Sequence, residues 1–357
     1  MTFERDNIAA MDGYVSGEQP NDPNTTKLNT NENPYPPTPE IGQVISGFNA
    51  DKLRRYPPPD ADDFRDTAAA LHQIDRNNII VTRGGDELLR LMLTTFVDPG
   101  QPIGITEPTY SLYPVLARIQ NCPVTSVPLQ DDWKPPESFA KSLNEAGVKV
   151  TFLVNPHAPS GVLLDHSQIA DIAAELNGVL LLDEAYVDFV DPEKHYDSIP
   201  LIRDLDNVVI LRTLSKGYSL AGLRIGYGVG PEQLILPMLR KTRDSYNIDW
   251  LSQDIATAAL KEQSYAEDTW SKVRRERAEL VSDLTRLGFS IVPSETNFLL
   301  ATVPLPLTAQ ALYLALKNQG ILVRYFEHQG LDDKLRITVG TPPQNSRLIS
   351  AIGEQLP

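Results

Sequence analysis

The stretch that decides the fold runs from Val208 to Val229 and reads VVILRTLSKGYSLAGLRIGYGV. It opens with an apolar run typical of a buried strand and passes into a polar turn that contains Lys216. Arg224 lies eight residues after the lysine, in a Gly-rich segment. Hydroxyl side chains and an arginine beside such a lysine indicate an anion site, and the lysine itself suits a Schiff base with an aldehyde cofactor. The alternative at this point is a solvated loop lysine.

Apolar strands and helical patterns alternate along the chain from about residue 80 to residue 230. Residues 78–82, 148–154 and 179–182 are examples of the strands. This order predicts right-handed βαβ units and a mostly parallel sheet between helices, which is the α/β class. Ligands bind such sheets at the carboxyl ends of the strands. The polar residues that follow the strands are therefore predicted to share one site: Asp86, Tyr110, Asn155, Asp183, Tyr186 and Lys216.

Two glycines, Gly84 and Gly85, separate the strand at 78–82 from a helix predicted over 88–97. A strand, a glycine turn and a helix bring free backbone N–H groups and the helix dipole to one point. This layout predicts a cradle for an anion.

The chain divides into three predicted parts. Residues 1–36 are polar and Pro-rich, which predicts an extended arm that lies on another surface, most simply a second subunit. Residues 51–248 form the predicted larger domain. Residues 37–50 and 249–357 form a predicted smaller α+β domain, with long helices over 251–260 and 265–287 and strands over 297–302, 321–324 and 334–339.

Composition and charge exclude several classes of protein. The net charge of −15 argues against a nucleic-acid partner. Cys122 is the only cysteine, so the chain forms no internal disulfide. The histidine spacing predicts no metal site. No apolar run approaches the roughly 18 residues of a membrane span, and residues 1–14 lack the pattern of a signal peptide, so we expect a cytoplasmic protein with no membrane partner.

Several motifs, taken together, are similar to those of fold-type I pyridoxal-phosphate aminotransferases, and more narrowly to the histidinol-phosphate aminotransferase family. The motifs are YVSGEQP, LNTNENPYPP, RYPP, GGDE, EPTY, NPHAPSG, LLDEAY, TLSKGYSLAGLRIGY, GILVRYF and LRITVGT, and they extend over nearly the whole chain. The resemblance implies a large domain with a seven-stranded-type sheet between helices and a smaller α+β domain. His157-Ala158 and Ser160 depart from the commoner form of their loop, and Gly84-Gly85 stands where Gly-Ser is commoner.

The resemblance also implies a pyridoxal 5'-phosphate cofactor and a role for each site residue. Lys216 would bind the cofactor aldehyde and move the substrate α-proton, and Asp183 would face the pyridine nitrogen. Tyr186 and Asn155 would bind the phenolic oxygen, and Tyr110 would lie on the ring. The residues implied for the phosphate are Gly84, Gly85, Asp86, Ser215, Arg224, Thr213 and, from the partner subunit of a homodimer, Tyr56.

Substrate binding is implied for Arg336 and Arg324, with Tyr14 and Asn31 on the substrate side. The implied reaction moves an amino group between L-histidinol phosphate and 2-oxoglutarate in histidine biosynthesis. Three alternatives stay open: an aromatic amino-acid aminotransferase, a related decarboxylase or lyase, and a non-catalytic binding protein of this fold.

Overall fold

A seven-stranded sheet forms the centre of the larger part of the protein. The computed structural model describes residues 3–356. The strands are β2 (Ile79–Thr82), β3 (Ile103–Glu107), β4 (Val124–Pro128), β5 (Val150–Val154), β6 (Val179–Asp183), β7 (Val208–Thr213) and β8 (Gly226–Val229). Their order is β2-β8-β7-β6-β5-β3-β4, and β8 runs antiparallel to both of its neighbours. The predicted mostly parallel sheet is confirmed, with β8 as the exception that the sequence did not reveal.

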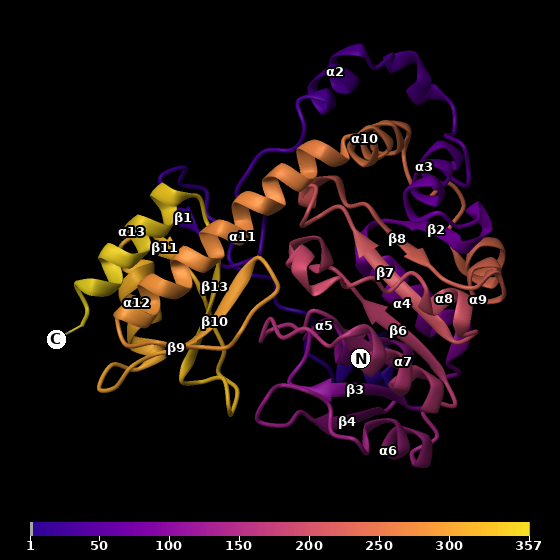
Figure 1. Cartoon of the computed structure of the whole chain (residues 1–357). Helices are drawn as coiled ribbons and strands as arrows, with labels where there is room; N and C mark the ends of the chain where they lie inside the picture. The colour runs from indigo at the N-terminus through magenta and orange to yellow at the C-terminus, as the bar shows by residue number, and fades with distance from the viewer. Residues whose placement is uncertain (1–2, 357) are drawn as a thin grey trace.

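Helices cover both faces of this sheet (Figure 1). One face carries α4 (Gly84–Phe96), α5 (Leu112–Gln120) and α9 (Glu232–Pro237), and the other carries α3 (Asp62–His72), α6 (Phe139–Glu145), α7 (His166–Glu175) and α8 (Leu201–Asp204). Alternate residues of β7 point to opposite faces of the sheet. Val209 packs against the first set of helices, and Ile210 packs against the second set. Burial on both faces explains why these strands read as continuous apolar runs.

A four-stranded antiparallel sheet forms the centre of the smaller part. Its order is β12-β13-β10-β9, with β9 (Ser290–Ile291), β10 (Phe298–Thr302), β12 (Arg324–Tyr325) and β13 (Lys334–Thr338). The helices α11 (Gln263–Arg286), α12 (Ala309–Asn318) and α13 (Pro342–Gly353) pack against this sheet. Figure 1 shows α11 running from the larger part to the smaller one.

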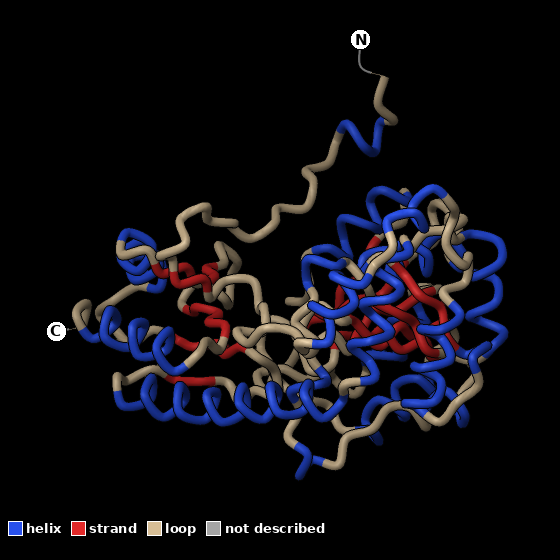
Figure 2. Tube along the Cα trace, turned by 90° about the horizontal axis from the view of Figure 1, so that it is seen from above, coloured by secondary structure: helices blue, strands red, loops and turns tan. Residues whose placement is uncertain are grey.

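The N-terminal region connects with both parts. Helix α1 (Asp6–Ala9) lies against α5, where Asn7 donates to the backbone oxygen of Arg118 at 2.7 Å. Strand β1 (Thr26–Lys27) pairs in parallel with β11 (Ile321–Leu322) in the smaller part. Figure 2 shows the segment between α1 and β1 as an extended arm that leads from α1 to the smaller part.

Three details differ from the sequence-based prediction. Helix α4 begins at Gly84 rather than at residue 88, so both glycines belong to its first turn. The acidic Asp86 and Glu87 also lie in that turn, where the helix dipole favours them. The strand predicted over 321–324 is divided between two sheets, as β11 and β12. Helices α1, α6, α8 and α9 were not predicted.

The helices α2 (Glu40–Gly47) and α10 (Trp250–Lys261) pack together, and α10 also packs on α3. Ile41 and Ile255 join the same apolar cluster as the larger sheet. The domain boundaries at residues 50 and 249 stay a prediction, and this packing groups the two helices with the larger sheet. Short 3-10 segments are η1 (Ala50–Arg54), η2 (Arg76–Asn78), η3 (Val187–Phe189), η4 (Pro192–Lys194) and η5 (Ala221–Leu223), and Met238–Thr242 forms a π-helical turn.

Within residues 3–356 no helix is both long and apolar enough to cross a membrane.

His157 ties the loop after β5 to the loop after β3. Its Nδ1 lies 2.7 Å from the Ser160 hydroxyl and its Nε2 lies 3.0 Å from the backbone oxygen of Pro108. The carbonyl can only accept, so Nε2 carries the proton and Nδ1 accepts from the serine. Burial lowers the pKa of His157 to about 4, so the ring stays neutral in the folded protein.

A buried neutral histidine destabilises the fold as the pH falls. Between pH about 6.5 and about 4 the unfolded chain takes up a proton that folded His157 does not, which costs about 1.4 kcal/mol per pH unit. We expect His157→Asn, which does not titrate, to lose less stability across this window, as measured by urea unfolding at several pH values.

The pH profile of wild type must be compared with that of His157→Asn, because Asp183 and Asp188 change the stability in the opposite direction as the pH falls. Burial raises their pKa values to about 6 and about 7, so both favour folding at lower pH, and they are common to both variants. Parallel pH profiles for wild type and His157→Asn would contradict the expectation.

Candidate active site

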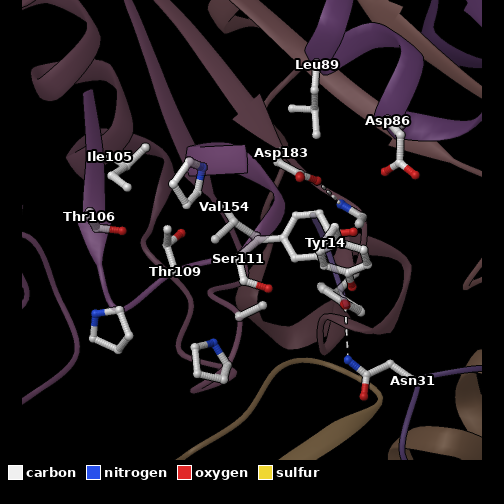
Figure 3. Close-up of a pocket in the computed structure, with 18 of the residues that line it drawn as sticks. Tyr14, Asn31, Asp86, Leu89, Ile105, Thr106, Thr109, Ser111, Val154 and Asp183 are labelled. Carbon is white, nitrogen blue, oxygen red and sulfur yellow. Dashed lines mark hydrogen bonds between the residues drawn. The ribbon is translucent and has the colours of Figure 1, made fainter. Parts of the chain in front are cut away.

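A cavity of about 890 Å³ opens at the carboxyl edge of the larger sheet. The smaller part supplies its opposite side through β12, β13 and the loop between them. Figure 3 shows Asp183 and Asp86 on one side of the cavity and Asn31 on the other. Most of the predicted site residues line it: Tyr14, Asn31, Gly85, Asp86, Tyr110, Asp183, Tyr186, Thr213, Ser215, Lys216, Arg224, Arg324 and Arg336.

Lys216 follows β7 and points into this cavity. Its Nζ donates to the backbone oxygen of Thr30 at 2.9 Å and lies 5.9 Å from the centre of the Tyr186 ring. Burial is the main cause that lowers the pKa of Lys216 to about 8, and the guanidinium of Arg336 adds to it. The amine therefore reaches its neutral, nucleophilic form far more readily than a solvated lysine.

The backbone next to this lysine is held from several sides. The carbonyl oxygen of Gly217 accepts from Trp270 Nε1 at 2.8 Å and from Asn33 Nδ2 at 3.1 Å. Asp188 packs so closely that a Cβ on Gly217 would lie 2.1 Å from Asp188 Oδ2. The peptide after Lys216 is thus fixed by α11, by the N-terminal segment and by the loop after β6.

Asp183 ends β6, between Val154 of β5 and Leu211 of β7 in the sheet register. Its Oδ1 accepts from the backbone N–H of Ala185 at 3.1 Å, and its Oδ2 accepts from the Tyr113 hydroxyl at 2.8 Å. Burial raises the pKa of Asp183 to about 6 although both hydrogen bonds lower it. A buried carboxylate of this kind suits a cationic partner in the cavity.

Tyr186 and Asn31 join the two parts of the protein. The Asn31 side chain donates to the Tyr186 hydroxyl at 3.1 Å, and the Asn31 backbone N–H donates to Thr338 of β13 at 3.0 Å. Asn31 has a φ of 56°, in the left-handed region that asparagine tolerates. Burial raises the pKa of Tyr186, so its hydroxyl stays protonated at neutral pH.

The amino end of α4 and the residues after β7 meet at one end of the cavity. Arg224 Nη2 lies 3.4 Å from Asp86 Oδ2, and Thr213 donates to the Ser215 hydroxyl at 3.0 Å. Gly84 has a φ of 74°, and a Cβ there would lie 2.8 Å from Arg224 Nη2. The positive φ favours glycine at this position, and the arginine packs directly over the helix end.

Two arginines face each other on adjacent strands at the substrate side. Arg324 of β12 pairs in register with Arg336 of β13, and both guanidinium groups lie near the Phe326 ring, at 5.5 and 5.6 Å. Arg336 Nη2 donates to the Asn29 backbone oxygen at 3.1 Å, whereas its buried Nε has no hydrogen-bond partner within residues 3–356. Burial lowers the pKa of Arg336. A cation held in this way favours an anionic ligand.

Comparison with known proteins assigns the family. Residues 23–352 match the family described as aminotransferase class I and II. The chain is 42% identical over 357 residues to histidinol-phosphate aminotransferase 1 of Trichormus variabilis, with 99% of each chain covered. The chain belongs to the histidinol-phosphate aminotransferases. Histidinol-phosphate aminotransferase of Microcystis aeruginosa is 41% identical, over 98% of this chain and 97% of that protein.

A solved structure has the same fold. Histidinol-phosphate aminotransferase from Sinorhizobium meliloti, determined in complex with pyridoxal-5'-phosphate, superposes with a TM-score of 0.92 at 23% identity and covers 100% of this chain and 98% of that one.

The cavity of this aminotransferase fits such a cofactor. An amine of lowered pKa, a buried carboxyl and a glycine-bounded helix end with an arginine surround one space. These groups match an aldehyde, a ring nitrogen and a phosphate. Residues 3–356 contain no cluster of three or more residues suited to holding a metal ion.

Three predicted site residues of the aminotransferase lie outside the cavity lining. Gly84 lies behind Arg224, as described above. The Asn155 side chain is completely buried and donates to Leu164 O at 3.1 Å and to the Tyr196 hydroxyl at 2.9 Å. Its predicted contact with the cofactor, which uses the same amide group, stays a prediction.

Tyr56 also lies away from the cavity of its own chain. It is 76% exposed and stacks on Tyr246, with ring centroids 4.5 Å apart. This position agrees with a role toward another molecule rather than toward its own site.

Sequence reasoning missed three contributors to the site. The Thr30 carbonyl and the Trp270 indole have no local signature. Every residue has a backbone carbonyl, so the sequence does not show which one contacts the lysine, and Trp270 lies in a distant helix. Tyr113 did have a signal: it is the one hydroxyl among the buried residues of α5, whose others are Leu112, Leu116 and Ala117.

The packing around Gly217 predicts that an alanine there disrupts the protein far more than an alanine at Gly222. Gly217→Ala forces a methyl group into Asp188 and should displace Lys216, with a loss of about 1–3 kcal/mol of stability and weaker cofactor attachment. Gly222→Ala is the matched control, since its Cβ meets nothing within 4 Å. Urea unfolding and the yield of borohydride-reduced cofactor adduct measure the two effects. Equal behaviour of the two variants would show that the contact with Asp188 does not hold the lysine.

Proposed function

We propose that this protein transfers an amino group between L-histidinol phosphate and 2-oxoglutarate, giving imidazole-acetol phosphate and glutamate, as a step of histidine biosynthesis. The observation that carries the proposal is the convergence of Lys216, Asp183 and Arg336 on one cavity. The names of relatives at 41–42% identity support the choice of substrate.

The cofactor of this proposal is pyridoxal 5'-phosphate, held by residues from several elements. Asp183 would hold the ring nitrogen, Tyr110 would contact the ring, and Tyr186 and Asn155 would bind the phenolic oxygen. The phosphate is held at the start of α4 and after β7 by Gly84, Gly85, Asp86, Thr213, Ser215 and Arg224. When bound, the cofactor supplies an aldehyde and an electron-withdrawing ring that stabilises negative charge at the substrate α-carbon.

Lys216 Nζ moves the proton of the reaction. It would take the proton from the substrate α-carbon and return it to the aldehyde carbon of the cofactor, on the other side of the amino nitrogen, as a general base and then a general acid. A pKa of about 8 places the amine near the operating pH, where both forms are populated. Asp183 keeps the proton on the ring nitrogen, because its carboxylate favours the cationic form.

Histidinol phosphate and glutamate use the same cavity in turn, and both carry anionic groups. We assign the α-carboxylate of glutamate to Arg336, and the phosphate of histidinol phosphate or the distal carboxylate of glutamate to Arg324. A guanidinium fork accepts phosphate and carboxylate alike, which suits alternating substrates. Tyr14, edge-on to Tyr110 at 6.0 Å, and Asn31 complete this side.

A substrate panel tests the proposal directly. We expect kcat/KM with 2-oxoglutarate to be highest for histidinol phosphate, and Lys216→Ala to abolish turnover while the protein stays folded. A kcat/KM for phenylalanine equal to or above that for histidinol phosphate identifies an aromatic amino-acid aminotransferase instead. Release of CO2 identifies a decarboxylase. Absence of a borohydride-reducible cofactor adduct identifies a binding protein.

We further propose a cytoplasmic homodimer in which Tyr56 of one subunit reaches the cofactor phosphate of the other. The exposure of Tyr56, its stack on Tyr246 and the three prolines that follow it support a rigid, presented side chain. Sedimentation should give a dimer, and Tyr56→Phe should raise the dissociation constant of the cofactor several-fold. Tyr313→Phe, which alters a stacked tyrosine of the smaller part, is the control. A monomer with full cofactor affinity would contradict the shared site.

A further inference from the structure

Tyr113 occupies a position that packing alone does not explain. It comes from α5, is completely buried, and stacks on Phe152 of β5 with ring centroids 5.0 Å apart. Its ring also meets Tyr110 edge-on at 5.4 Å and 87°. Its hydroxyl donates to Asp183 Oδ2 at 2.8 Å. One side chain therefore touches both the acid at the end of β6 and the tyrosine that covers the cavity.

The hydrogen bond from Tyr113 matters because burial and two nearby carboxylates favour the neutral form of Asp183. Burial raises its pKa, and the carboxylates of Asp86 in α4 and Glu184 beside it act in the same direction. The Tyr113 hydroxyl and the Ala185 backbone N–H act against them. The other titratable group facing it is Tyr186, whose hydroxyl stays protonated.

The hydrogen bond from the Tyr113 hydroxyl also sets the orientation of the Asp183 carboxyl group. It donates to Oδ2, while Ala185 donates to Oδ1, so the two bonds fix the rotation of the carboxyl group about its Cβ–Cγ bond. The Phe152 stack leaves the Tyr113 ring no alternative rotamer without opening the core.

We propose that Tyr113 is a positioning residue of the transamination site, which keeps the Asp183 carboxylate ionised and correctly turned toward the cofactor ring nitrogen. The inference rests on the proposed function, because it concerns the same cofactor. A protonated Asp183 would no longer favour a proton on the ring nitrogen, so loss of the Tyr113 hydroxyl weakens the electron-withdrawing state of the site.

The test removes the hydroxyl and keeps the ring. In Tyr113→Phe we expect kcat/KM to fall about ten- to hundred-fold, the usual effect of losing a hydrogen bond to a charged group. The acidic limb of the pH profile should move to higher pH by about one unit. The dissociation constant of pyridoxal 5'-phosphate, measured by equilibrium dialysis, should rise, and most strongly at low pH.

Tyr227→Phe is the matched control. Tyr227 is also buried, at 3% exposure, and its hydroxyl bonds His72 at 2.9 Å rather than a site residue. We expect it to leave the pH profile and the cofactor dissociation constant unchanged. An unchanged acidic limb in Tyr113→Phe would overturn the proposal and leave Tyr113 as core packing.

A double-mutant cycle tests whether Tyr113 acts through Asp183. In an Asp183→Asn background, Tyr113→Phe should change the cofactor dissociation constant by less than about two-fold, because no ionised carboxylate remains to be held. The same fold-change in both backgrounds would also overturn the proposal. Because dialysis needs no amino donor, these outcomes are distinguishable from an error in the substrate assignment.

Discussion

Shared burial of an amine and a carboxyl group at one edge of a parallel sheet is the constraint on which the rest of the site depends. Burial disfavours charge on both groups, so the pKa of Lys216 falls to about 8 while that of Asp183 rises to about 6. Each group is held by a polar partner, the Thr30 carbonyl for the lysine and the Tyr113 hydroxyl for the aspartate. Both partners come from outside the strands that carry the two groups. The proton chemistry of the site therefore depends on segments other than the two strands that carry these groups.

The sequence predicted those features that follow from local pattern. Apolar runs ending in polar residues located the strands, and parallel strands bring their carboxyl ends to one edge, so Asp183 and Lys216 could be placed together before the structure was seen. Features set by tertiary contact could not be placed. β8 runs antiparallel to both of its neighbours, and Gly226 and Gly228 allow the Gly84 backbone and the Ile80 side chain to approach it closely; periodicity encodes neither feature. Tyr113 reads as an ordinary core residue until the end of β6 is placed beside it.

Beneath the cavity a buried polar network replaces the apolar core. Asn155 bonds the Tyr196 hydroxyl, Tyr196 donates to Glu184 Oε1 at 2.6 Å, and Glu184 pairs with Arg212 at 2.7 Å. Such a network adds little net stability over apolar packing, since desolvation offsets the attraction. Its effect is orientation: the hydrogen bonds and the ion pair set the positions of Asn155, Tyr196 and Glu184 relative to one another. The loops after β5 and β6 are thereby held in a fixed relation to the lysine loop after β7.

The segment from Thr26 to Asn33 contacts both the smaller part and the loop that carries Lys216. β1 joins it to the smaller part, where the Asn29 carbonyl accepts from Arg336, while the Thr30 carbonyl accepts from Lys216 and Asn33 bonds the Gly217 carbonyl. Four of the residues 29–33 thus contact site groups, and the Asn31 side chain donates to the Tyr186 hydroxyl. The same short segment therefore holds both the arginine to which we assign the substrate carboxylate and the lysine to which we assign the proton transfer. The position of each depends on the conformation of this one stretch of backbone.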